Sequence, residues 1–228
     1  MQNNTYLILS CEHAVDTIPN EYLYLFNKHQ EILKTHRAID FGADSIANFL
    51  SSMLHCDLIS AAATRLLIDC NRSLTSACFS EITHKLSMAD KQQIIATYYL
   101  PFRTQVAQKI NTAIASGKYV LHLSIHSFTP IFHGIVRNAD LGLLYDPSRA
   151  TEKNFARNLQ KQLKSHYHTR LNYPYLGISD GHTTALRKQY ADHMYTGIEV
   201  ECNQKLTRSV AELRVLEKTL ADSLAGIL

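Results

Sequence analysis

Short apolar runs alternate with longer amphipathic segments along this chain, and this alternation limits its fold more than any other feature. Runs without helical spacing are typical of buried strands, and they occur at 6–10, 57–63, 66–68, 119–125, 141–145 and 197–200. Apolar residues recur at helical spacing over 41–54, 87–116 with a break at Pro101, 147–166 and 206–228. The alternation predicts one three-layer α/β domain over residues 1–228, phosphorylase/hydrolase-like, with a mostly parallel twisted sheet and helices on both faces.

The composition excludes several other classes of protein. A chain of 228 residues with 46% hydrophobic and 19% charged residues is typical of a soluble globular protein, and a net charge of +3 indicates neither nucleic acid nor a membrane surface as a partner. We expect a cytoplasmic protein, because the sequence shows no basic leader and no apolar run long enough to span a bilayer. Nothing in the sequence specifies an oligomeric state. An odd number of cysteines, matching no metal-binding or redox spacing, is expected to be reduced: Cys11, Cys56, Cys70, Cys78 and Cys202.

Titratable residues gather where the expected strands end. His13, Asp69, His126 and Glu201 each lie at or just beyond the carboxyl end of such a run. In a parallel sheet these ends meet at one edge, where open α/β folds bind their ligands. We therefore expect the four side chains to lie close together.

Two histidines and a carboxylate are the ligand set of a catalytic zinc site that keeps one position for water. His13 and His126 supply the imidazoles, and two aspartates compete for the third place. Asp16 follows His13 at the spacing of a His-x-x-acid pair, but it also fits a turn before Pro19. Asp40 precedes a predicted helix, where it would otherwise serve as the N-cap.

A compact polar cluster follows the run at 66–68. Its Arg72 offers a bidentate fork for a substrate carboxylate, Asn71 can orient the same group, and Asp69 completes the cluster. A loop with a surface salt bridge would give the same pattern. Further basic candidates for substrate binding are Arg65, Arg137 and Arg187.

Glu199 and Glu201 share one face of the last expected strand. Two buried carboxylates on one face are costly without partners, which favours a functional role for at least one. A glutamate beside zinc-bound water is the usual general base in metal-assisted amide hydrolysis. Glu201 is the better candidate because it lies nearer the edge of the sheet, and Glu199 is its rival.

Several blocks of the sequence resemble those of the N-formylglutamate amidohydrolase family, and they follow in that family's order. They are SCEHA at 10–14, HRAIDFG at 36–42, TRLLIDCNR at 64–72, SIHS at 124–127, YPYLG at 173–177 and VECNQ at 200–204. Two blocks depart from the family pattern. The stretch YLPFR at 99–103 lacks the family's histidine, and Gln204 stands where many members have arginine.

The resemblance implies a zinc hydrolase related to the zinc carboxypeptidases and aspartoacylases, in which an Asn-Arg pair matching Asn71 and Arg72 grips the substrate carboxylate. A similar order of blocks in zinc N-acetylmuramoyl-L-alanine amidases selects His13, Asp40 and His126 as ligands and leaves Glu201 as the base. The implied reaction cuts N-formyl-L-glutamate, a small-molecule N-acyl amino acid, into formate and glutamate, a step in histidine degradation. A zinc amidase for another N-acyl or peptidoglycan-type amide and a non-catalytic binding module are the alternatives.

Overall fold

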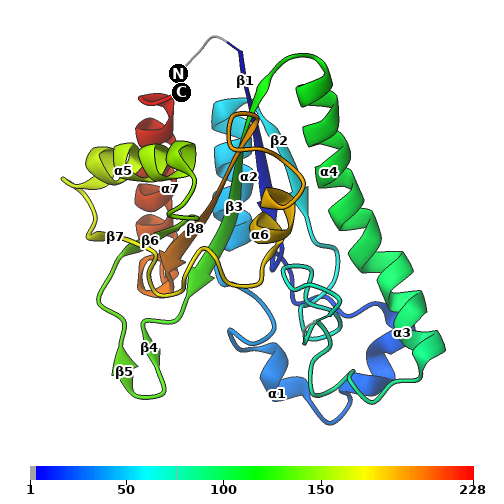
Figure 1. Cartoon of the computed structure of the whole chain (residues 1–228). Coiled ribbons are helices and arrows are strands. Elements are labelled where there is room, and N and C mark those ends of the chain that lie inside the picture. The colour runs from blue at the N-terminus through cyan, green and yellow to red at the C-terminus, as the bar shows by residue number, and fades with distance from the viewer. Residues whose placement is uncertain (1–3, 76) are drawn as a thin grey trace.

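A six-stranded sheet of order β2-β1-β3-β8-β6-β7 forms the centre of the computed structural model, which describes residues 4–75 and 77–228 (Figure 1). β1 runs parallel to β2 and β3, β3 runs parallel to β8, and β6 runs parallel to β7, whereas β6 and β8 are antiparallel. The mostly parallel sheet predicted from the sequence is thus confirmed. Its strands are β1 (Thr5–Cys11), β2 (Asp57–Ser60), β3 (Tyr119–Phe128), β6 (Leu141–Leu144), β7 (Thr169–Leu171) and β8 (Tyr195–Asn203).

Helices cover both faces of this sheet and complete the three predicted layers (Figure 1). One apolar core joins the sheet to α2 (Ala43–Leu54), α5 (Ala150–Leu163) and α7 (Val210–Ala225). A second core on the opposite face involves α3 (Met88–Ile94), a π-helical segment (Ile95–Tyr99), α4 (Leu100–Ala115) and α6 (His182–Arg187). None of the helices in the described part of the chain is long and apolar enough to cross a membrane.

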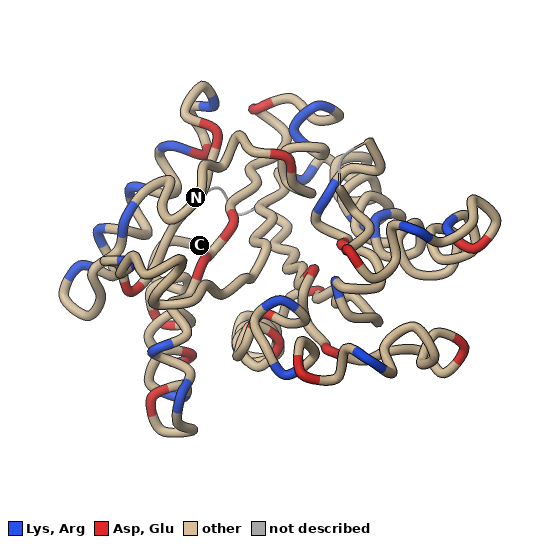
Figure 2. The backbone as a smooth tube through the Cα atoms, turned by 90° about the horizontal axis from the view of Figure 1, so that it is seen from below, with Lys and Arg blue, Asp and Glu red and all other residues tan. Residues whose placement is uncertain are grey.

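Short elements gather near the carboxyl ends of the strands, toward the bottom of Figure 1. They are the helix α1 (Gln30–Leu33), the hairpin of β4 (Ile131–Phe132) and β5 (Ile135–Val136), and 3-10 turns at Asn20–Phe26 and Gln204–Thr207. Figure 2 views the molecule from this side, and basic and acidic residues are intermixed over it. This end of the sheet is where the sequence predicts a site.

The expected strand at 66–68 is wrong. These residues form turns, with the Leu67 amide donating to the Thr64 carbonyl at 2.9 Å and the Thr64 hydroxyl donating to the Ala38 carbonyl at 2.9 Å. Leu67 and Ile68 are buried all the same, because they pack into the core beneath α4. The run at 66–68 is apolar because it is buried, and a buried turn has the same apolar pattern as a buried strand.

Three predicted boundaries also differ from the structure. The strand expected over 57–63 ends at Ser60. The break predicted at Pro101 falls one residue earlier, where the π-helical segment Ile95–Tyr99 gives way to α4 at Leu100, so Pro101 lies in the first turn of α4. The last helix begins at Val210 rather than 206, since Ser209 caps it by accepting a hydrogen bond from the Glu212 amide at 3.2 Å.

Candidate active site

His13, Asp40 and His126 converge at the carboxyl ends of the adjacent strands β1 and β3. One potential ligand atom from each lies within 4.8 Å of the others, and all three residues are buried. Asp40 Oδ2 lies 3.2 Å from His13 Nδ1 and 3.0 Å from His126 Nδ1. Asp16 is exposed and lies outside this cluster. The structure therefore brings together the three residues expected from the resemblance.

Asp40 reaches the cluster because the chain bends sharply before α2. Gly42, not Asp40, occupies the helix N-cap, with a left-handed φ of 82°. A side chain at Gly42 would also collide with Thr207, whose Cγ2 lies 2.6 Å from where a Cβ would be. The Asp40 amide donates to the His13 carbonyl at 3.1 Å, which ties the bend to the end of β1. The carboxylate is therefore turned toward the histidines and does not cap its helix.

The other ring nitrogen of each histidine is also held. His13 Nε2 lies 2.8 Å from Asp69 Oδ1. His126 Nε2 lies 2.8 Å from Ser124 Oγ and 3.2 Å from Glu12 Oε2. Carboxylates behind metal-binding histidines fix the ring orientation and the tautomer. Asp69, expected to bind substrate, thus lies behind His13, where it also pairs with Arg65.

Acidic groups outnumber the fixed positive charge at this site. Burial alone would raise the pKa of Asp40, but His13, His126 and Arg65 hold it well below its usual range. Burial alone would lower the pKa of His126, but hydrogen bonds to Asp40 and Glu12 raise it well above the ordinary value. The site thus favours added positive charge, which either protons or a metal ion can supply.

Glu201 on β8 is the register partner of His126 on β3 and lies beside it. It is 5% exposed, and burial raises its pKa to about 7, with the nearby carboxylates of Asp40 and Glu199 adding to the shift. Its Oε2 is buried without a hydrogen bond among the described residues. Glu199 is held differently, because its Oε1 accepts a hydrogen bond from the Thr183 hydroxyl at 2.6 Å. Glu201 thus combines a raised pKa with a buried oxygen that has no hydrogen bond among the described residues.

A cavity of about 360 Å³ opens beside these groups. Its lining includes Asn71, Arg72 and Arg65 together with both glutamates. Arg65 is already paired with Asp40 and Asp69, at 3.3 and 2.9 Å. The Arg72 guanidinium donates to the Asp180 carbonyl at 2.6 Å, and Asn71 Oδ1 accepts from the His182 amide at 2.7 Å. Asn71 and Arg72 of the polar cluster after 66–68 therefore form part of the cavity wall, whereas Asp69 does not line it.

Comparison with known proteins identifies the family of the chain. The sequence model of the N-formylglutamate amidohydrolase family matches residues 5–208. The chain belongs to the N-formylglutamate amidohydrolase family. It is therefore a hydrolase of the amidohydrolase type. No curated protein sequence matches the chain.

Two solved structures resemble the chain over nearly its whole length. A gene product of Agrobacterium tumefaciens is 28% identical, with a TM-score of 0.81 over 97% of this chain and 91% of that one. The N-formylglutamate amidohydrolase of Ralstonia eutropha JMP134 is 18% identical, with a TM-score of 0.74 over 97% of this chain and 92% of that one. At such low identity the second likeness shows the fold alone.

Two expected substrate-binding residues do not line the cavity: Asp69, which lies behind His13, and Arg187. The Arg187 guanidinium is buried on the core side of α6, where its Nε lies 2.9 Å from Glu152 and its Nη2 donates to the Gly197 carbonyl at 2.8 Å. Arg187 does not line the cavity, and its hydrogen bonds tie α6 to α5 and β8. The placement gives this arginine a structural role in place of the expected contact with substrate.

The sequence interpretation missed Glu12, which is 1% exposed and links the site to the core. Its carboxylate accepts hydrogen bonds from the hydroxyls of Ser10 at 2.7 Å and Ser124 at 2.6 Å, and it lies 3.0 Å from His182 Nδ1. Burial alone would raise the pKa of Glu12, but His126 and His182 lower it well below its usual range. One signal for a buried partner was present in the sequence. Ser124 and His126 occupy alternate positions of one strand, so both polar side chains face the same side and need a polar partner there.

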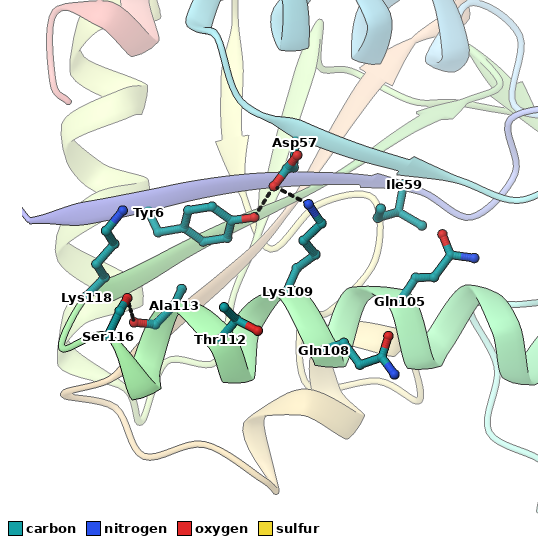
Figure 3. A pocket seen from close by; sticks show the side chains of 10 residues that line it. All are labelled: Tyr6, Asp57, Ile59, Gln105, Gln108, Lys109, Thr112, Ala113, Ser116 and Lys118. Carbon is teal, nitrogen blue, oxygen red and sulfur yellow. Dashed lines mark hydrogen bonds and ion pairs between the residues drawn. The ribbon is translucent and has the colours of Figure 1, made fainter.

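A separate hollow lies between α4 and the strands β1 and β2 (Figure 3). Its carboxylate, Asp57, accepts a hydrogen bond from the Tyr6 hydroxyl and pairs with Lys109 Nζ at 3.0 Å. None of the cluster residues His13, Asp40 and His126 lines it. Because Asp57 is engaged twice, this hollow lacks the unengaged carboxylate that marks the site at the sheet edge.

Proposed function

We propose that the chain is a zinc-dependent amidohydrolase that cleaves N-formyl-L-glutamate, or a similar N-acyl amino acid, to formate and glutamate. The observation that carries the proposal is the convergence of His13, Asp40 and His126 next to Glu201, whose buried Oε2 has no hydrogen bond among the described residues. The family supports the reaction class. The substrate is inferred from the family resemblance, and the metal from the donor set of the site.

The donor set fits a catalytic zinc ion. Two imidazole nitrogens and one carboxylate oxygen lie within 4.8 Å of one another, and three protein ligands leave a fourth position for water. The outer nitrogens of the two histidines are held by Asp69 and by Glu12 with Ser124, an arrangement typical of zinc sites. When bound there, zinc would polarise the acyl carbonyl and acidify a water molecule.

Glu201 would act as the general base. A base works best when its pKa lies near the operating pH, and burial brings the pKa of Glu201 to about 7. In this proposal the carboxylate takes a proton from the attacking water and passes it to the departing amine nitrogen. Asn71 and Arg72, on the neighbouring wall, would hold the α-carboxylate of the substrate.

An assay of the purified protein tests the proposal directly. With one equivalent of zinc, we expect formate release from N-formyl-L-glutamate, and a loss of that activity after chelation. N-acetyl-L-glutamate and a muramoyl-peptide amide serve as comparison substrates. Preference for the muramoyl amide would favour the peptidoglycan-type alternative. Absence of hydrolysis of every amide by the zinc-loaded protein would favour a binding module.

A further inference from the structure

Arg137 lines the same cavity as Glu201 and Arg72, yet it has no role in the proposed reaction. Among residues 4–75 and 77–228, no carboxylate forms an ion pair with its guanidinium. Aromatic rings surround it instead, with centroids 4.5 Å (Phe132), 5.0 Å (Tyr175) and 5.8 Å (Phe128) from Cζ. Arg137 is partly exposed, and a guanidinium that packs on rings keeps its full charge. It is therefore available to bind an anion.

The fold fixes this guanidinium from two sides. Arg137 follows the β4–β5 hairpin, and its amide donates to the Pro130 carbonyl at 2.8 Å, which closes the hairpin. Its Nη2 donates to the Tyr175 hydroxyl at 3.0 Å. The Tyr175 loop is anchored by Asn172, whose Oδ1 accepts from the amides of Tyr145 and Gly177, each at 3.0 Å. The guanidinium is thus held in place before any ligand arrives.

The charges in the cavity leave Arg137 as a second anion site. Arg65 is neutralised by Asp40 and Asp69, and the proposed function already assigns Arg72 to the α-carboxylate. An additional carboxylate on the substrate would be repelled by Glu199 and Glu201 unless a cation balanced it. Arg137 is the lining residue that can do so.

We propose that Arg137, held by Tyr175, binds the side-chain carboxylate of the substrate and so selects N-acyl dicarboxylic amino acids. This inference rests on the proposed function, because it takes Arg72 as the site of the α-carboxylate. A neutral isostere would leave the packed guanidinium without its partner. Selectivity would therefore come from the penalty on the wrong substrate as much as from attraction for the right one.

The test compares N-formyl-L-glutamate with N-formyl-L-glutamine, which has nearly the same shape but a neutral side chain. We expect wild type to prefer the glutamate compound in kcat/KM by roughly ten- to a hundredfold, the range for a hydrogen bond to a charged group. Arg137→Gln should bring that ratio close to one, mainly by raising KM for the glutamate compound. Arg137→Lys, which keeps the charge, should retain part of the preference.

Arg170→Gln is the matched control, because Arg170 stacks on Tyr173 at 3.9 Å without lining the cavity. Calorimetric binding of L-glutamate and L-glutamine to the same proteins gives a readout that needs no turnover. If wild type cuts neither formyl compound but binds glutamate in preference to glutamine through Arg137, the proposed function fails and the subsite stands. If wild type cuts N-formyl-L-glutamate and Arg137→Gln keeps the preference, or loses both substrates equally, the subsite is refuted. Absence of both cleavage and glutamate binding overturns both.

Discussion

The two glutamates of this site differ in their hydrogen bonds. Glu199 and Glu201 share a face of β8, but Glu199 accepts a hydrogen bond from Thr183, whereas Glu201 Oε2 has no hydrogen bond among the described residues. Burial raises the pKa of Glu201 to about 7. The two glutamates should therefore respond differently to the same substitution.

Glu201→Gln should lose most turnover, because it keeps the shape of the side chain and removes its basicity. We expect kcat to fall by roughly 10²–10⁴-fold while bound zinc is retained, which metal analysis of the purified variant would check. Glu199→Gln is the control and should keep most of its activity. A dead Glu199→Gln beside an active Glu201→Gln would exchange the two roles.

Glu201→Gln should also stabilise the metal-free protein at alkaline pH. The folded-state pKa of Glu201, about 7, lies above its unfolded value near 4.5, so at pH 8 the folded state bears the cost of a buried charge. That cost declines as pH falls below 7 and disappears below the unfolded pKa. We therefore expect Tm of the variant to exceed that of wild type at pH 8, with a gap that narrows toward pH 5. A gap independent of pH would show that Glu201 titrates normally.

Glu12→Gln should weaken zinc binding although Glu12 is not itself a ligand. The substitution removes the negative charge beside His126 Nε2, 3.2 Å away, and so the support that orients and polarises this ring. We expect zinc affinity, measured by chelator competition, to drop by roughly 10–100-fold. Glu217→Gln is the control, because Glu217 is also buried but accepts its hydrogen bond from Ser45 on α2. Equal affinity in all three proteins would mean that Glu12 only fills the core.

At the scale of whole elements, the helical stretch at 88–115 supports the loop that carries Asn71 and Arg72. Its π-helical segment ends in Tyr99, whose hydroxyl donates to the Arg72 carbonyl at 2.8 Å. From the first turns of α4, Arg103 donates to the carbonyls of Cys70 and Arg72, both at 2.9 Å. These bonds hold the backbone that carries Asn71 and Arg72.

Arg103→Met should loosen that loop without touching the reacting groups. We expect KM for N-formyl-L-glutamate to rise several-fold with a smaller change in kcat, the pattern of lost ground-state binding. Steady-state kinetics beside Arg157→Met, an exposed arginine of α5, would check this. A fall in kcat at unchanged KM would place Arg103 in the chemistry instead.

The sequence predicts whether a segment is a helix or a strand where its hydrophobic period is sustained. It does not predict where each side chain lies in the fold. The strands that carry His13, His126 and Glu201 were found because each is a buried run that ends in polar residues. The run at 66–68 was misread because burial alone does not distinguish a packed turn from a strand. The short strands β4, β5 and β7 were missed since two or three residues show no period. Neither could the sequence tell that Arg187 faces Glu152, because a buried arginine and a substrate-binding arginine look alike before folding.

At the scale of the whole molecule, zinc and folding should be coupled. The proposed ligands come from separate parts of the chain, so the unfolded state offers no ready-made site. We expect zinc at about 100 Kd to raise the free energy of unfolding by about 2.7 kcal/mol. This corresponds to an increase in Tm of roughly 5–10 °C. Because the pKa of His126 is raised, protons compete with zinc, and the increase should be smaller at pH 6 than at pH 8. Calorimetry of wild type and His126→Ala would check both points, since the same zinc shift in the variant would remove His126 from the ligand set.

The order of the sheet also bears on how the protein is made. β3 is buried and central, with β1 on one side and β8 on the other, yet β8 is the last strand to be synthesised. Until β8 leaves the ribosome, β3 is an unpaired edge, the kind of surface on which growing chains aggregate. The same delay keeps Glu201 away from His13, Asp40 and His126. A chain interrupted before residue 195 therefore lacks both its last central strand and its proposed base. Such an unfinished chain would be prone to aggregate and would have no catalytic activity.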